Sequence, residues 1–312
     1  MIRAVRRQGT MTQIELSLRA PAPAPAGYLR RYWLFAMPAV LMVAAVIVFP
    51  WCFTLFMSFS DWSLTGAITF VGLENYKTLF ADERFRGAVA TTLYFTALAV
   101  VLPIFFGTAA ALVFHEKFPL RGVLRAVFIM PMMATPVAVA LVWTMMFHPQ
   151  LGVLNYLLTS LGLPPSLWVY DIKTVIPTLV MIEVWHWTPL VMLIVLGGLA
   201  GLPAEPYESA RIDGANAWHM FRHITLPLIW PFITIALIIR TIDALKAFDT
   251  IFVITQGGPG TASETINLFL YQQAFGNFKM GYASAVVVIF FLIVIMLALV
   301  LLYVRQKSKW ND

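Results

Sequence analysis

The chain has 312 residues, of which 60% are hydrophobic and only 12% are charged, and its net charge is +6. About a quarter of the residues of a soluble domain are charged, so this composition excludes an ordinary soluble, disordered or disulfide-rich secreted protein. The single cysteine, Cys52, lies in an apolar run and can form neither an intrachain disulfide nor a cysteine metal site. The basic residues flank apolar stretches, which indicates membrane topology and anionic lipid contacts, not nucleic-acid binding.

The first 31 residues are basic and contain alternating proline and alanine from Pro21 to Ala26. Such a segment favours an extended linker without a fold. A cleaved signal peptide is the alternative, but the apolar run that follows is about twice as long as a signal core and has no clear small-residue cleavage site. We therefore expect a tail at 1–31.

Six apolar stretches are long enough to span a bilayer, which needs roughly 20 residues of helix. The sequence therefore predicts an all-α integral membrane protein with six transmembrane helices in a domain covering 32–305, followed by a short tail at 306–312. Pro131 and Pro136 predict a kink in the third span, and Pro189 predicts a break in the fourth. The expected spans are 32–59, 88–114, 123–147, 174–199, 228–255 and 282–304.

The basic residues are distributed unevenly between the two sides of the expected spans. Fourteen of the 21 Lys and Arg residues lie on the side of the termini, five lie on the opposite side, and Arg240 and Lys246 lie within a span. Cytoplasmic segments carry the excess of Lys and Arg, so both termini are predicted to be cytoplasmic.

The loop between the fourth and fifth spans, residues 200–227, is unlike the other connections. Pro206 suits the first turn of a short helix, and Gly214 suits the position just past its end. Asn216 can cap a second helix, which carries an apolar stripe at Trp218, Phe221 and Ile224. The pattern alone fits a docking element for a partner and a helix lying among lipid headgroups equally well.

The spacing of this loop resembles the "EAA" loop of binding-protein-dependent ABC importer permeases, with Ser209 in place of the second residue. Residues 70–76 after the first span and 255–259 after the fifth also resemble the sugar-uptake branch of that family. The likeness covers the chain from about Tyr32 onward. The residues that match the loop motif or its flanks are Glu208, Ser209, Ala210, Asp213, Gly214, Ile224, Leu226 and Pro227.

The resemblance implies a type I ABC importer permease fold and a loop that docks as a coupling helix into a cytoplasmic ATPase. It further implies a bacterial cytoplasmic (inner) membrane location, a second similar permease, two ATPase copies and an extracytoplasmic solute-binding protein. ATP and Mg would be held by the ATPase, because the chain has no Gly-Lys pair for a phosphate-binding loop. We expect no cofactor on this chain and no enzyme activity of its own.

His219 and His223 have the spacing of two metal ligands on a helix, but no third ligand is evident. We therefore expect no metal site there, and interpret both residues as polar groups that face the headgroups or the ATPase.

Charged residues inside a span usually face a partner or a watery cavity. Arg240, Asp243, Lys246 and Asp249 recur every three residues in the fifth span with alternating sign, and Phe248 precedes the last of them. The four charges fit a structural ladder of ion pairs or the lining of a solute path, and the spacing does not choose between the two.

In the fourth span, Glu183 stands near Trp185, His186 and Trp187. A sugar has polar rims and apolar ring faces, so it suits a carboxylate beside aromatic platforms. The tryptophans could instead belong to an interfacial belt. We expect Glu183, Trp185 and Trp187 to line the solute path together with Phe248 and the four charges of span five. The external segments 61–86, 148–171 and 256–281 could form a platform for the solute-binding protein.

The sequence thus predicts the permease subunit of an ABC importer for a sugar, polyol or glycoside. Alternatives are a glycerol-phosphate-type ABC permease, which would need a free Arg240 or Lys246, and a proton-coupled secondary transporter, which would use Glu183 and His186 as a relay. A homodimer of this chain is the less favoured arrangement, since the sugar branch usually pairs two different permeases.

Overall fold

The computed structural model describes residues 27–63 and 66–307, so the expected tails at 1–31 and 306–312 lie largely outside the described residues. The chain divides into two compact units, with the boundary after Phe53. The first unit contains α2 (Gly27–Val43), a π-helical turn (Ala44–Val48) and the start of α3 (Phe49–Ser58). Residues Phe35–Ser58 form a helix that is apolar and long enough to cross a membrane, as expected of the first span.

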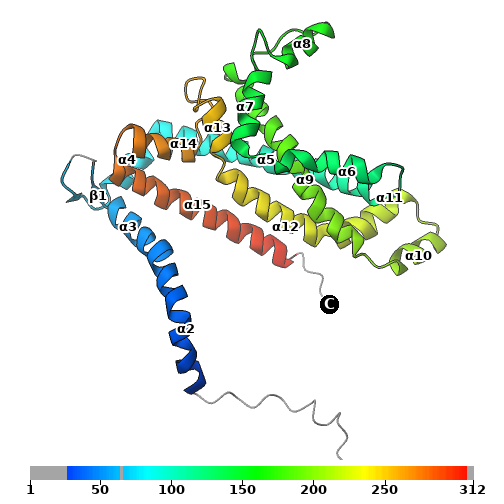
Figure 1. Ribbon diagram of the computed structural model, residues 1–312, viewed down its shortest axis with the longest axis horizontal. Helices are drawn as coiled ribbons and strands as arrows, with labels where there is room; N and C mark the ends of the chain where they lie inside the picture. The colour runs from blue at the N-terminus through cyan, green and yellow to red at the C-terminus, as the bar shows by residue number, and fades with distance from the viewer. Residues whose placement is uncertain (1–26, 64–65, 308–312) are drawn as a thin grey trace, which may run out of the picture. The chain divides into compact units, whose positions relative to one another are not determined.

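The second unit is helical, apart from a small antiparallel hairpin in which Ser60 pairs with Phe70. Its largest elements are the long helices α5, α9, α12 and α15 (Figure 1). The elements that follow α3 are β1 (Ser60–Asp61), β2 (Thr69–Phe70), α4 (Glu74–Ala81), α5 (Glu83–His115), α6 (Arg121–Ile129), η2 (Met130–Met133), α7 (Pro136–Met146), α8 (Val153–Ser160), η3 (Trp168–Tyr170), α9 (Val175–Ala200), α10 (Glu205–Ile212), α11 (Ala217–Met220), η4 (Phe221–Thr225), α12 (Leu226–Leu245), α13 (Asp249–Ile254), α14 (Ile266–Tyr271), η5 (Gln272–Gly276) and α15 (Met280–Lys307).

The described residues contain five helices that could each cross a membrane, and a bent pair that raises the number to six if it counts as one span. The pair joins Arg121–Met133 to Pro136–Met146 at an angle of 98°. Thr135 is extended, as expected of a residue before proline. The predicted kink in the third span is confirmed.

The predicted break at Pro189 is wrong, because α9 continues through this proline to Ala200. Pro189 is buried among neighbouring helices, and such surroundings allow a membrane helix to tolerate a proline.

The fifth span is shorter than predicted. The sequence predicted one helix over 228–255, whereas α12 ends at Leu245 and α13 begins at Asp249. The charges on either side are compatible with the interruption: Lys246 follows the carboxyl end of α12, where a cation is favourable, and Asp249 stands in the first turn of α13, where an anion is favourable.

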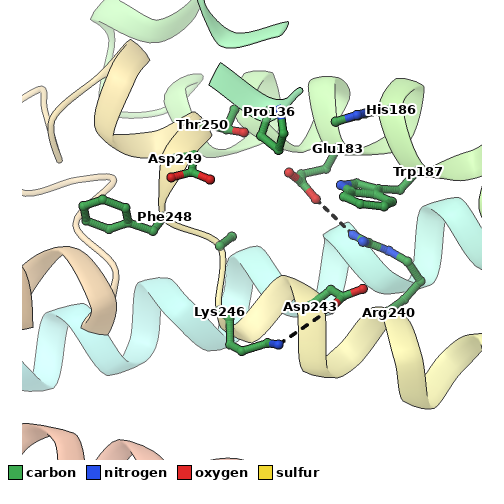
Figure 2. Close-up of a pocket in the computed structure, with 11 residues that line it drawn as sticks. Pro136, Glu183, His186, Trp187, Arg240, Asp243, Lys246, Phe248, Asp249 and Thr250 are labelled. Atoms are coloured by element: carbon green, nitrogen blue, oxygen red, sulfur yellow. Dashed lines mark hydrogen bonds and ion pairs between the residues drawn. The ribbon is translucent and has the colours of Figure 1, made fainter. Parts of the chain in front are cut away.

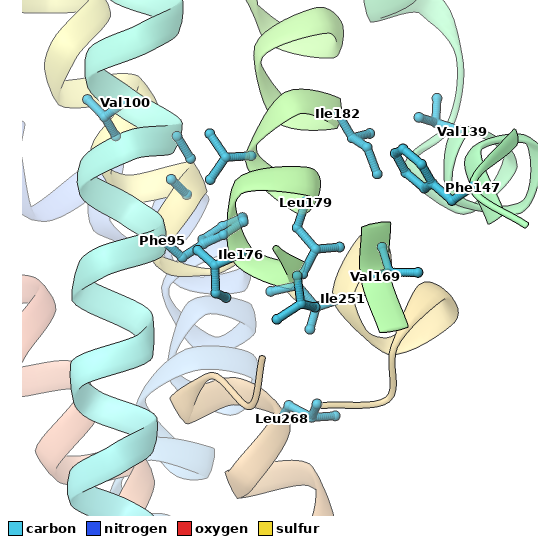
Figure 3. Close-up of a cluster of buried hydrophobic side chains, with 14 residues drawn as sticks. Phe95, Val100, Val139, Phe147, Val169, Ile176, Leu179, Ile182, Ile251 and Leu268 are labelled. Atoms are coloured by element: carbon cyan, nitrogen blue, oxygen red, sulfur yellow. The ribbon is translucent and has the colours of Figure 1, made fainter. Parts of the chain in front are cut away.

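Helices α5 and α9 pack closely along each other. A Cβ added at Gly107 would lie 2.6 Å from Cβ of Val191, so the two backbones approach to a distance that only glycine permits. In the amino-terminal halves of both helices, a cluster of buried apolar side chains fills the space between α5, α9, α7 and α13 (Figure 3). Its labelled members include Phe95, Leu179 and Ile251.

Polar contacts join the amino end of α5 to the segments around α14 and α15. Asp82 caps α5 by accepting a hydrogen bond from the backbone N–H of Arg84 at 2.8 Å, and it also accepts one from Tyr282 at 2.9 Å. The Arg84 guanidinium donates to both carboxylate oxygens of the buried Glu264, each at 2.7 Å. These bonds fix the frame on which the remaining helices pack.

Candidate functional site

A cavity of about 250 Å³ lies where α9, α12 and α13 meet the start of α7 (Figure 2). It contains seven of the eight residues that the sequence assigned to a solute path. The full lining is Pro136, Glu183, His186, Trp187, Arg240, Asp243, Lys246, Ala247, Phe248, Asp249 and Thr250.

The innermost contact of this cavity is a buried ion pair between α12 and α9. Nη2 of Arg240 lies 2.9 Å from a carboxylate oxygen of Glu183, and both side chains are almost fully buried. The same Nη2 donates to the backbone carbonyl of Ala99 on α5 at 3.4 Å. The guanidinium also lies over the ring of Trp187, 4.7 Å from the ring centroid, and a cation in this position is attracted by the electron-rich face.

Two N–H groups of Arg240 have no acceptor in the part of the chain that the structure describes. Nε and Nη1 are buried without a hydrogen-bond partner, although Arg240 lines the cavity. A buried donor without an acceptor is costly, so these groups need an oxygen acceptor that the described residues do not supply.

The second ion pair of the cavity is much more open. Nζ of Lys246 lies 3.9 Å from Asp243, and 59% of the lysine side chain is exposed. Asp249 is also exposed, and it forms no ion pair with any described residue. The structure contains one ion pair of the ladder considered from the sequence, that of Lys246 with Asp243. Arg240 pairs instead with Glu183 on another helix, and α12 ends before Lys246.

Trp185 is the predicted path residue that lies outside the cavity. Its side chain is 44% exposed and packs edge-on against Trp143, with 5.6 Å between ring centroids. Next to it, Nε2 of His186 lies 3.2 Å from the carbonyl of Ala134 in the kinked third span.

Sequence reasoning did not select Pro136, Ala247 or Thr250, which complete the wall. Thr250 could have been found from its position next to Asp249. Pro136 lines the cavity because of the bend of 98° in the third span. No local signal in the sequence predicts that this bend lies against α9.

The loop between α9 and α12 has the geometry that its residue types predict. Pro206 stands in the first turn of α10, Gly214 adopts a positive φ of 77°, and the Asn216 side chain accepts a hydrogen bond from the N–H of His219 at 2.9 Å. The hydroxyl of Tyr207 donates to Oγ1 of Thr225 at 3.0 Å, which joins α10 to the base of α12.

The sequence suggested that the second helix of this loop is short and separate, and this prediction is wrong. Residues Ala217–Leu245 form one helix of 29 residues, with a π-helical turn at Phe221–Thr225. Of the eight predicted coupling residues, Glu208, Ser209, Asp213, Gly214 and Pro227 are exposed, and Ala210, Ile224 and Leu226 are half-buried.

The rings of His219 and His223 stack with 5.7 Å between their centroids. Within residues 27–63 and 66–307, no group of three or more His, Cys, Asp or Glu side chains is arranged to hold a metal ion.

Residues 103–310 match the family described as "Binding-protein-dependent transport system inner membrane component". Because the match covers more than half of the chain, this protein belongs to that family of ABC importer permeases. It is a multi-pass membrane subunit with apolar spanning helices.

Several curated relatives are permeases of named transport systems. The trehalose/maltose transport system permease protein MalF of Thermococcus litoralis is 34% identical over 88% of this chain and 92% of its own length. The trehalose transport system permease protein SugA of Mycobacterium tuberculosis is 32% identical over 88% of each chain. The sulfoquinovosyl glycerol transport system permease protein SmoG of Agrobacterium fabrum is 32% identical over 88% of this chain and 90% of its own.

The fold is that of a type I ABC importer permease. A chain from the crystal structure of a bacterial ABC transporter involved in the import of the acidic polysaccharide alginate superposes with a TM-score of 0.79, covering 91% of this chain and 98% of that one at 23% identity. A second structure of an alginate transporter, in complex with a periplasmic protein bound to an alginate pentasaccharide, gives a TM-score of 0.75 over 90% of this chain and 94% of that one at 23% identity.

Proposed function

We propose that this chain is one of two different permease subunits of an ATP-driven importer for a sugar, polyol or glycoside. A solute-binding protein delivers the solute from outside, and two copies of an ATPase bind below. The relatives named for trehalose, maltose and sulfoquinovosyl glycerol support the solute class. The excess of Lys and Arg on the side of the termini supports a topology with both termini in the cytoplasm, and the family's description as an inner membrane component supports a bacterial cytoplasmic membrane location.

One observation carries the proposal: the loop and the cavity lie on the same helix. The helix begins at Ala217 in the loop and extends through α12 to Leu245. Arg240 therefore lies about 35 Å along the axis from Ala217, at about 1.5 Å per residue. A displacement of the loop is transmitted to one wall of the cavity, because a helix is a stiff element.

The coupling step follows from this connection. ATP draws the two ATPases together, and they pull on α10 and the Gly214 turn through Glu208, Ser209, Ala210 and Asp213. Residues Ile224, Leu226 and Pro227 join the turn to the membrane part of α12. Rotation of α12 against α9 then opens the cavity alternately to the outside and the inside, as rigid-body transitions do in other proteins.

The cavity has the chemistry that a sugar needs. Trp187 and Phe248 offer ring faces for C–H groups, Asp243 and Asp249 offer acceptors for hydroxyl protons, and Arg240 has donors without acceptors. Carbohydrate sites combine such aromatic and polar groups. We assign this cavity to the solute path, together with a matching surface of the second permease.

The test of coupling is the substitution Gly214→Asp, with Gly201→Asp as the matched control. Gly214 has a φ of +77° with open space around it, and it lies at the docking turn, whereas Gly201 in the same loop has a φ of −97°. We expect the Gly214 variant to insert and assemble normally while uptake is lost and ATP hydrolysis continues, and the control to remain coupled. Unaltered uptake by Gly214→Asp contradicts the docking assignment.

A second measurement separates the importer from a proton-coupled transporter. Native mass spectrometry of the protein extracted in mild detergent should detect an ATPase bound to the chain. Reconstituted vesicles that accumulate solute without any ATPase would contradict the proposed function.

A further inference from the structure

The charges that line the cavity do not balance. Three carboxylates, from Glu183, Asp243 and Asp249, face two cations, Arg240 and Lys246. No other titratable group except His186 lines this cavity, and its ring nitrogen lies beside a backbone carbonyl.

The two cations are both engaged by carboxylates. Arg240 pairs with Glu183 at 2.9 Å in a buried contact, and Lys246 lies 3.9 Å from Asp243. Of the three carboxylates that line the cavity, Asp249 is the one without an ion-pair partner among the described residues. It is exposed on the cavity wall, and Figure 2 shows its carboxylate between Phe248 and Thr250.

The N–H groups of Arg240 that lack an acceptor do not change the excess of negative charge in the cavity. Nε and Nη1 are buried without acceptors, but the positive charge of the group is already compensated by Glu183. These N–H groups can donate to the oxygen of a hydroxyl without needing an anion. A phosphate or carboxylate entering the same space would instead meet the uncompensated charge of Asp249, and like charges close together repel each other.

We propose that this cavity accepts an electrically neutral polyhydroxyl solute and discriminates against anionic ones, with Asp249 as the residue that sets the preference. This inference rests on the proposed function, in which the cavity lines the solute path. It argues against a glycerol phosphate ester as the solute. It also separates this chain from its structural neighbour, whose described cargo is the acidic polysaccharide alginate, and from the relative named for sulfoquinovosyl glycerol, which carries a sulfonate. Neither the shared fold nor the shared family therefore decides the charge of the solute.

The first arm of the test measures the electrostatic potential of the cavity without any solute. The chain has one cysteine, Cys52, so a Cys52→Ser background allows a single thiol to be introduced by Ala247→Cys on the cavity wall. The assembled transporter is treated with a cationic trimethylammonium-ethyl or an anionic sulfonatoethyl methanethiosulfonate of similar size. Intact-mass spectrometry of this chain gives both modification rates.

We expect the cationic reagent to react faster than the anionic one. Asp249→Asn should lower the ratio of the two rates about tenfold, the effect of one nearby charge in a watery cavity. Lys246→Gln, the matched substitution of opposite sign, should raise it. An anionic preference, equal rates, no reaction with either reagent, or a ratio insensitive to Asp249→Asn overturns the proposal.

The second arm asks which solute occupies the cavity. The introduced thiol is modified by the neutral methyl methanethiosulfonate in the presence of trehalose, maltose or trehalose 6-phosphate at equal concentrations. We expect a neutral disaccharide to slow the reaction several times more than the phosphate ester does, and Asp249→Asn to reduce this difference. Equal or stronger protection by the phosphate ester overturns the proposed preference for neutral solutes, but not the assignment of the solute path. Protection by none of the three overturns the assignment of the solute path, even if the first arm finds a negative potential.

Discussion

Helices α10 and α11 of the loop contain no buried residue, whereas the cavity further along α12 is closed by Arg240 and Glu183, which are almost fully buried. The loop is shaped by local contacts: a cap at Asn216, a positive φ at Gly214 and one hydrogen bond from Tyr207. The cavity depends on groups from separate helices that must stay in register. We infer that the loop can change partners without altering the fold, and that small shifts between α9 and α12 alter the cavity.

The largest effect is expected from Glu183→Leu, which leaves Arg240 as a buried charge without its partner. Breaking such a pair costs about 3–5 kcal/mol in the free energy of unfolding. Chemical denaturation in detergent measures the loss.

The double substitution Glu183→Leu with Arg240→Met is the control, because replacing both members of a buried pair by apolar residues is far less costly. If the single and double variants are equally unstable, the ion pair is not what holds α9 to α12 at the cavity.

A smaller effect is expected from Gly107→Ala, which tests the packing of α5 against the helix that carries Glu183. The new methyl group would lie 2.6 Å from Cβ of Val191, and overpacking of this kind costs about 1–3 kcal/mol. Gly87→Ala in the same helix is the matched control, since no atom lies within 4 Å of its added Cβ. Thermal unfolding should separate the two variants, and equal melting temperatures would contradict the close approach of α5 and α9.

On the loop side, Asn216→Ala removes the cap of the helix that begins at Ala217, at a cost of about 1 kcal/mol. We expect local opening to increase roughly fivefold, because 1.4 kcal/mol corresponds to a factor of ten. Trypsin added to inside-out vesicles should cut faster after the exposed Arg211 and Arg222, while global stability stays nearly constant. Asn216→Ser, which retains a capping oxygen, should behave like the parent chain.

The smallest effect is expected from Tyr207→Phe, which removes the hydrogen bond to Thr225 and costs at most about 1 kcal/mol. Hydrogen exchange measured by mass spectrometry should become faster in α10 and remain unchanged in α9. A change that extends to α9 would show that this hydrogen bond also stabilises the helix bundle and not the loop alone.

The first helix, the turn and the cap of the loop could be derived from the sequence, because they depend on residues within a few positions of one another. The continuation of the second helix into α12 could not. Pro206, Gly214 and Asn216 each have a local backbone preference, and each adopts it. The sequence predicted most of the residues that line the cavity but not how they contact one another. Glu183 and Arg240 were both selected as charges inside spans, whereas their mutual contact at 2.9 Å depends on the packing of α9 against α12. Trp185 and Trp187 are two residues apart, and only Trp187 faces the cavity.

The sequence by itself determined that this protein is a helical membrane protein, where its spans lie except for the ends of the fifth, and the backbone shape of the turn and cap in the loop between α9 and α12. These properties depend on hydrophobic length and local backbone chemistry, which are fixed by neighbours in the chain. Only the tertiary structure decided that α12 stops at Leu245, that it is continuous with the loop helix, and that one carboxylate of the cavity has no ion-pair partner within the described residues. Ion pairing is a property of distances between helices, and those distances are set by side-chain packing that no local pattern encodes.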